Sequence, residues 1–131
     1  MFHYYLAVLK KYAVFSGRAS RAEYWYFFLF DSIIIIGLYS IILIIILREI
    51  YSSFTAGSMG VPAWIVPLMI FFAIYVLAVF IPTIAVSVRR MHDVNKSGWF
   101  IFIPIYNIIL AVTDGTKGDN KYGPEPKVKT N

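Results

Sequence analysis

The chain has 131 residues, about the size of one domain, of which 60% are hydrophobic and only 15% are charged. Soluble domains are about 45–50% apolar and about 25% charged, so a soluble fold of this size has too little interior to bury these side chains. The absence of cysteine excludes disulfides, thiolate metal sites and cysteine nucleophiles. The net charge of +5 indicates cytoplasmic flanks and contact with anionic lipid, not a nucleic-acid partner.

Residues 2–15 are predicted to form an amphipathic helix. Apolar and aromatic side chains recur there at helical spacing, at Phe2, Tyr5, Leu6, Leu9, Tyr12 and Ala13. The segment is too short to cross a bilayer, and its mixture of aromatic and basic residues suits a helix that lies in the membrane interface. The same stripe can also pack on the protein's own spans, and the two interpretations are compatible.

Two segments are long enough to cross a hydrocarbon core, which needs about 20 apolar residues. The first predicted span covers residues 24–47, and Ser20 with Glu23 before it has the spacing of a capping box. Residues 48–62 are predicted to form a polar loop, with a turn at 57–60. The second predicted span covers residues 63–88 and contains Pro82, where we expect a kink.

The third apolar segment, residues 98–112, is shorter than the other two and is interrupted by Pro104 and Asn107. Segments of this length are often re-entrant or interfacial, although a short span is the alternative. Residues 113–131 are predicted to form a polar tail of turns and coil. The fold class expected is therefore an all-α membrane protein in a single domain, residues 1–131, with an N-terminal interfacial helix, two long spans and this short third segment.

Basic residues are distributed unequally around the two long spans. Four precede the first span and three follow the second, whereas the predicted loop between the spans contains Arg48 alone. The positive-inside rule therefore predicts that the N-terminus and the 89–97 loop are cytoplasmic and that the 48–62 loop is outside. The tail, with four lysines, lies outside if the third segment spans and inside if it turns back, and the rule favours the inside.

Charged residues are predicted to cluster at the cytoplasmic face if the two spans form an antiparallel hairpin. The candidates are Arg18, Arg21, Glu23, Arg89, Arg90, His92 and Asp93. One interpretation is a structural network in which the two carboxylates pair with arginines. The other is a binding site in which arginine forks hold an anionic headgroup or ligand.

Two further candidates carry titratable groups. Asp31 lies inside the first predicted span, where a carboxylate is costly and marks a functional site by default; it is neutral there, or it meets a partner such as Arg89 or Arg90. The adjacent His92 and Asp93 allow the carboxylate to orient the imidazole ring. We recognise no catalytic nucleophile, metal site or cofactor motif.

Three motifs together resemble the family known as domain of unknown function 805. They are residues 15–25 (FSGRASRAEYW), residues 89–93 (RRMHD) with 97–99 (SGW), and residues 115–124 (GTKGDNKYGP), which includes Asn120. Met91 stands where the family usually has leucine. The resemblance implies a small multi-pass protein of the bacterial inner (plasma) membrane without an established activity, and it marks the three polar clusters as the family's signature.

Three functional hypotheses follow. The leading one is a non-enzymatic membrane protein whose cytoplasmic-face cluster binds an anionic lipid, a small ligand or a partner protein. The second is a subunit of a transporter or proton-coupled channel that uses Asp31 with His92 and Asp93, which requires a homo-oligomer because two or three spans cannot enclose a pore. The third is an intramembrane enzyme with His92 and Asp93 as its acid–base pair.

Overall fold

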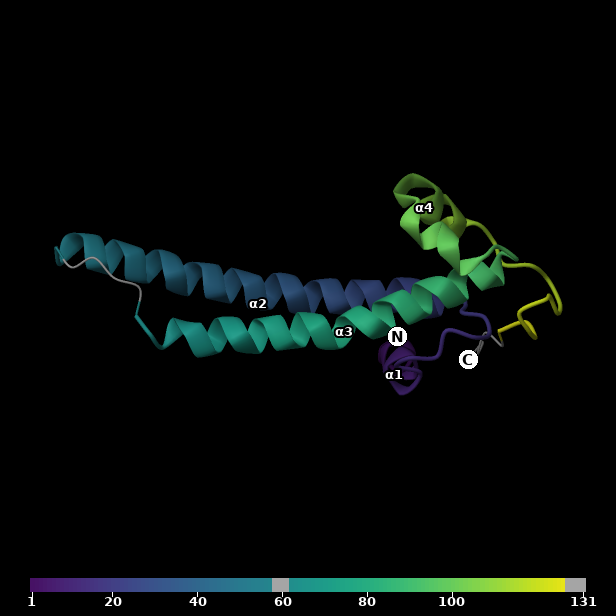
Figure 1. The fold of residues 1–131 in the computed structure, drawn as a ribbon, viewed down its shortest axis with the longest axis horizontal. Helices are drawn as coiled ribbons and strands as arrows, with labels where there is room; N and C mark the ends of the chain where they lie inside the picture. The colour runs from purple at the N-terminus through teal and green to yellow at the C-terminus, as the bar shows by residue number, and fades with distance from the viewer. Residues whose placement is uncertain (58–61, 127–131) are drawn as a thin grey trace. The chain divides into compact units, whose positions relative to one another are not determined.

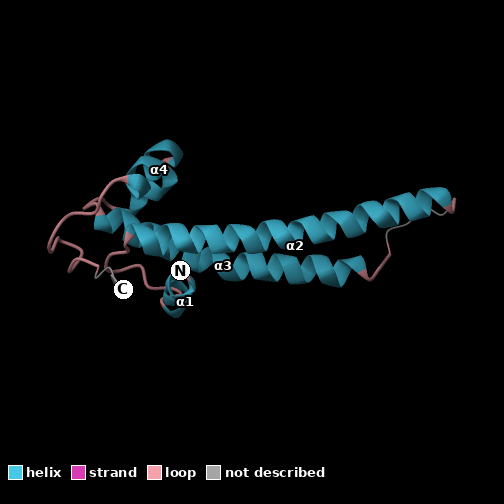
Figure 2. Cartoon of the chain, turned by 180° about the vertical axis from the view of Figure 1, so that it is seen from behind, coloured by secondary structure: helices cyan, strands magenta, loops and turns pink. Residues whose placement is uncertain are grey.

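The computed structural model describes residues 1–57 and 62–126, and within them it contains helices and no strands. The elements are α1 (Phe2–Lys10), α2 (Arg21–Thr55), α3 (Ile65–Asp93), the 3₁₀ helix η1 (Gly98–Phe102) and α4 (Pro104–Val112) (Figure 1). The cartoon in Figure 2 shows the same elements from behind. The all-helical class predicted from the sequence is confirmed.

The chain divides into two compact units. Unit 1 comprises Met1–Phe30 and Phe80–Asn131, and unit 2 comprises Asp31–Val79. Unit 2 contains most of α2, the first half of α3 and the residues that connect them. Unit 1 contains the other helices, the start of α2, the end of α3 and the tail. All three sequence motifs therefore fall in unit 1.

Helices α2 and α3 have the length and composition of membrane spans. They contain 35 and 29 residues, and only 11% and 17% of their most apolar windows are buried inside the protein. A core helix of a soluble protein would bury most of such a window, so lipid is the remaining solvent for these side chains.

Helix α2 continues past the end of the predicted span. Residues 48–55, expected in a polar loop, are helical. Arg48 and Glu49 are both compatible with a helix, and Thr55 Oγ1 donates hydrogen bonds to the Tyr51 and Ser52 carbonyl oxygens at 3.1 and 3.0 Å. The first strong helix breaker is Gly57, whose φ is +67°. The rest of the predicted turn, residues 58–60, lies outside the described residues.

Helix α3 passes through Pro82 and ends five residues beyond the predicted span, at Asp93. Its end is a Schellman motif, in which the Lys96 N–H donates to the Met91 carbonyl and the Asn95 N–H to the His92 carbonyl, both at 3.0 Å. Asn95 has φ +57°, the left-handed conformation that this motif requires. The arginine motif therefore lies on the last helical turn and not in a loop.

Helix α1 packs against the first turns of α2. Tyr5 stacks on Phe27 and Tyr4 on Tyr26, with ring centroids 5.4 and 5.6 Å apart, and Val8 is fully buried. The helix ends at Lys10, earlier than the range 2–15 expected from the sequence. The structure therefore shows packing on the protein's own span, and a position in the membrane interface stays a prediction.

The third apolar segment forms two short helices instead of one. They meet at Ile103, which is extended because Pro104 follows it and occupies the first position of α4. Asn107, expected to interrupt the segment, lies inside α4 and donates from Nδ2 to the Ile101 carbonyl at 3.4 Å. The nine residues of α4 rise only about 14 Å, less than half of a hydrocarbon core of about 30 Å.

Candidate functional site

The three sequence motifs meet in unit 1, where backbone hydrogen bonds join them. The Ala19 N–H donates to the Arg89 carbonyl at 3.0 Å, and the Thr116 N–H donates to the Asp93 carbonyl at 2.9 Å. The segment before α2 and the tail are thus both attached to the last turn of α3. The third segment therefore returns the tail to the arginine motif, which the sequence left open.

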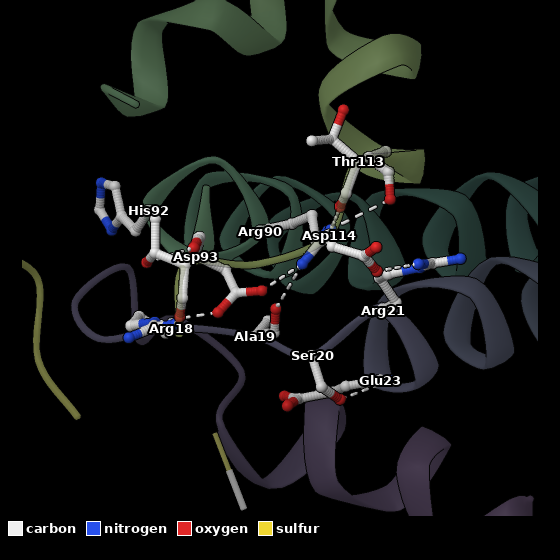
Figure 3. Close-up of polar contacts among 12 residues, drawn as sticks. Arg18, Ala19, Ser20, Arg21, Glu23, Arg90, His92, Asp93, Thr113 and Asp114 are labelled. Atoms are coloured by element: carbon white, nitrogen blue, oxygen red, sulfur yellow. Dashed lines mark hydrogen bonds and ion pairs between the residues drawn. The ribbon is translucent and has the colours of Figure 1, made fainter. Parts of the chain in front are cut away.

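Asp93 is the centre of a buried ionic network (Figure 3). Its Oδ1 accepts a hydrogen bond from Arg18 Nε at 2.9 Å, and its Oδ2 accepts one from Arg90 Nη1. The side chains of Arg18 and Arg90 are 1% and 0% exposed. Because a buried charge is costly unless it is paired, removal of Asp93 leaves both arginines uncompensated, and removal of either arginine breaks one of the two ion pairs.

The other donors of these two arginines go to backbone carbonyls. Arg18 donates to Thr116 and Gly118 of the tail at 2.5 and 2.6 Å, and Arg90 donates to Thr113 and, at 3.2 Å, to Ala111. The arginines therefore fasten the tail and the end of α4 to the last turn of α3. Their donors are occupied within the protein, which favours a structural role.

Arg89 differs from the other two buried arginines. Its Nη1 donates to Glu23 Oε1 at 2.5 Å, and its side chain is 1% exposed. Its Nε and Nη2 are buried and find no acceptor among the residues that the structure describes. Buried donors are rarely left unpaired, so this edge of the guanidinium requires an explanation.

Glu23 forms only half of the expected capping box. The Glu23 N–H donates to Ser20 Oγ at 3.2 Å, as the motif requires. The carboxylate pairs with Arg89 and lies 3.9 Å from Lys11 Nζ. Two cations therefore share this one carboxylate.

A pocket of about 580 Å³ lies beside this pair. Its polar and charged lining includes His3, Lys11, Arg18, Glu23, Arg89 and Glu125. A second pocket of about 410 Å³, with Trp99 and Phe102 in its wall, is mostly apolar. A third pocket of about 390 Å³, with Arg21, Asp114 and Lys117 in its wall, is also charged, but the first is the one that Arg89 lines.

His92 and Asp93 do not form the acid–base pair expected from their adjacency. His92 Nδ1 lies 3.2 Å from the Gly17 carbonyl oxygen, and its ring stacks on Tyr122 with centroids 3.9 Å apart. The Asp93 carboxylate is held by arginines. Consecutive residues on a helix point in different directions, which is why the expectation was wrong.

Asn120 holds the tail motif in place. Its Nδ2 donates to the His92 carbonyl at 3.0 Å and to Thr116 Oγ1 at 2.7 Å. Its Oδ1 accepts a hydrogen bond from the Tyr122 N–H at 2.9 Å. The side chain is thus occupied in shaping the turn.

Two of the candidate residues lie apart from the buried network. Arg21 is half exposed and pairs with the exposed Asp114 of the tail. Asp31 belongs to unit 2, where its Oδ1 accepts a hydrogen bond from the Tyr75 hydroxyl at 3.1 Å. Arg89 and Arg90 form ion pairs with Glu23 and Asp93 in unit 1, and a partnership of Asp31 with either arginine stays a prediction.

Sequence reasoning missed the individual importance of Gly115. A Cβ added there would lie 2.7 Å from Asp93 Cγ, so only glycine allows the tail to approach the buried carboxylate. Tyr75 was also missed, because one phenol in an apolar helix carries no pattern. Gly115 belongs to the motif that resembles the family, which was the available signal.

Comparison with known proteins agrees with this architecture. Residues 12–124 match the model of a family described as protein of unknown function, DUF805. Inner membrane protein YhaI of Escherichia coli (strain K12) is 36% identical over 98% of both chains. Inner membrane protein YhaH of the same strain is 34% identical, over 96% of this chain and 98% of its own. No solved structure matches the chain.

Proposed function

Because the chain belongs to the DUF805 family and its relatives are inner membrane proteins, we propose that it is a non-enzymatic protein that binds anionic lipid at the cytoplasmic face of that membrane. The family's description assigns no activity. The proposal therefore rests on the charges and contacts of unit 1.

The exposed charges of unit 1 carry the proposal. In its described part, six exposed basic residues stand against three exposed acidic ones, Asp114, Asp119 and Glu125. The basic residues are Lys10, Lys11, Arg21, Lys96, Lys117 and Lys121. Each lysine or arginine near an anionic leaflet contributes about 1 kcal/mol of attraction.

The same distribution supports a cytoplasmic position for unit 1. Arg48 is the basic residue of the predicted 48–62 loop, in unit 2, and the positive-inside rule assigns the basic side to the cytoplasm. Hydrogen bonds from Arg18 to Thr116 and Gly118 hold the tail beside the N-terminal segment. We therefore assign the N-terminus, the 89–97 loop and the tail to the cytoplasm, and residues 48–62 to the outside.

The buried network changes which residues are expected to bind. Arg18 and Arg90 are satisfied by Asp93 and by backbone carbonyls, so they hold the binding surface together and do not contact lipid. The exposed lysines, and not these buried arginines, are therefore the residues proposed to attract anionic lipid.

Lipid retention tests the proposal. The protein is purified in mild detergent, and native mass spectrometry compares retained phosphatidylglycerol with phosphatidylethanolamine. A triple variant Lys96→Gln, Lys117→Gln, Lys121→Gln is expected to lose most of the preference for the anionic lipid. Arg48→Gln is the matched control in unit 2 and should keep it. An unchanged preference in the folded triple variant contradicts the proposal.

One observation favours a second candidate, a homo-oligomeric transporter or proton-coupled channel subunit. Asp31 is buried and accepts a hydrogen bond from Tyr75, and both residues lie within the long apolar helices. Ionisable residues in such segments often mark an ion path. This function requires an oligomer, so the mass of the protein in nanodiscs decides it, and a strict monomer rules it out.

A further inference from the structure

We propose that Arg89 and the pocket that it lines form a binding site for a single phosphate oxyanion. The inference rests on the proposed anionic-lipid function and adds the position and chemistry of one site.

The free edge of Arg89 is a two-donor fork. The guanidinium is planar, and its Nε–H points parallel to one N–H of Nη2, while Nη1 lies on the other side. Nη1 is used by Glu23, and the two unpaired atoms are Nε and Nη2. The unsatisfied donors therefore form one complete edge, which matches two oxygens of a phosphate.

Leaving this edge empty has a measurable cost. A buried donor without an acceptor costs about 1–3 kcal/mol, and more when it carries charge. Arg18 and Arg90 use backbone carbonyls of the tail and of α4 to avoid this cost. Arg89 Nε and Nη2 have no such acceptor in the part of the chain that the structure describes. The oxygens of a bound anion provide these missing acceptors.

The charge around the pocket leaves room for one negative charge. Among the lining residues, Lys11, Arg18 and Arg89 carry three positive charges and Glu23 and Glu125 carry two negative ones. Asp93, the ion-pair partner of Arg18, and Arg90, the second partner of Asp93, add one charge of each sign. The surplus is one unit, which a phosphodiester or a singly ionised phosphate balances. The pocket volume of about 580 Å³ admits such a group with part of its substituent.

The unpaired nitrogens are shielded from solvent in this structure, so binding requires a movement of the side chains that cover them. Lys11 is half exposed at the same pocket and has a long flexible stem. Lys11 therefore adds another positive charge to the pocket that Arg89 lines. Phosphodiesters of lipid headgroups and free inorganic phosphate share this chemistry.

The test uses Arg89→Lys, which retains the charge and a donor for Glu23 but lacks the fork. Arg48→Lys is the matched control, because Arg48 is an exposed arginine of unit 2, outside the proposed binding surface. Binding is measured as phosphatidylglycerol retained by the purified protein and as the rise in its thermal unfolding midpoint with inorganic phosphate. We expect Arg89→Lys to weaken binding about tenfold and Arg48→Lys to change it less than twofold.

Each outcome has a distinct meaning. If folded Arg89→Lys binds like wild type, this site is refuted while the lipid function stands; if wild type shows no preference for anionic lipid, the lipid function itself fails. A phosphate-dependent rise that Arg89→Lys abolishes identifies free phosphate as a ligand, and lipid retention without that rise identifies the headgroup. Should Arg89→Lys not fold, Lys11→Gln decides, because Lys11 is exposed: unchanged binding refutes the site.

Discussion

Arg18 and Asp93, 75 positions apart in the chain, form a buried ion pair with Nε and Oδ1 2.9 Å apart. Asp93 also receives Arg90, so one carboxylate serves two guanidinium groups. Neither arginine has room for a ligand, because backbone carbonyls take their other donors. This ion pair therefore belongs to the structural framework of unit 1, and a ligand of unit 1 has to bind elsewhere.

Neutralising Arg18 is expected to destabilise the protein strongly. Arg18→Gln leaves Asp93 with one partner and removes donors from the tail carbonyls, and breaking a buried pair typically costs about 3–5 kcal/mol. Arg21→Gln makes the same chemical change at a half-exposed pair and should cost less than about 1 kcal/mol. Thermal unfolding in mild detergent, followed by circular dichroism, measures both.

Equal losses for the two variants would contradict the assignment of Arg18 to the scaffold. So would an Arg18→Gln protein that unfolds at the temperature of wild type. Both variants remove one positive charge from the same segment, so a difference in their stability reports the effect of burial and not of charge alone.

Gly115→Ala is expected to separate the tail from Asp93. The new Cβ would lie 2.7 Å from Asp93 Cγ, and overpacking of this kind costs about 1–3 kcal/mol. Gly37→Ala, where a Cβ meets nothing within 4 Å, is the control and should cause no loss. Limited proteolysis of the tail provides the measurement; equal cleavage rates for both variants would count against the contact.

Tyr75→Phe tests the hydrogen bond in unit 2. Removing the hydroxyl takes one donor from Asp31, and hydrogen bonds between membrane helices contribute about 0.6–1.7 kcal/mol. We expect a small fall in the unfolding midpoint. Asp31→Asn keeps an acceptor for the same hydroxyl and should fall less, and the opposite order would argue against this bond.

Reporter fusions test the orientation. A fusion after residue 126 and one at the N-terminus are both expected to report the cytoplasm, whereas an insertion at residue 57 should report the outside. The tail result follows from the hydrogen bonds between Arg18 and the tail. Termini reported on opposite sides of the membrane would contradict these hydrogen bonds, because Arg18 and the tail could not then lie in one unit.

The two spans and the family were predictable from the sequence, because both depend on local signals. Length and hydropathy mark α2 and α3, and the three motifs mark the family. The end of α2 was not predictable, because Arg48 and Glu49 are polar without being helix breakers. The two polar residues therefore led us to end the helix too early, whereas the helix ends just before Gly57, whose φ is positive.

The site was predictable as a cluster in which Glu23 and Asp93 pair with arginines, but the sequence did not show which arginine each carboxylate takes. Sequence proximity joined His92 to Asp93, yet the helix turns them apart and Asp93 faces Arg18. Nothing in the sequence distinguishes Arg89 from Arg90. Only the fold shows that Arg90 donates to acceptors within the protein, whereas Nε and Nη2 of Arg89 have no acceptor among the described residues.

The contacts of Arg18 also impose an order on biosynthesis. Its side chain can form the ion pair only after Asp93 has been synthesised. Its hydrogen bonds to Gly118 and Gly123 form later still, because these residues follow it by 100 and 105 positions. Chains are made from the N-terminus, so both long helices are synthesised while this arginine still lacks its partners. Such distant contacts close slowly, and unit 1 is therefore completed only after almost the whole chain has left the ribosome.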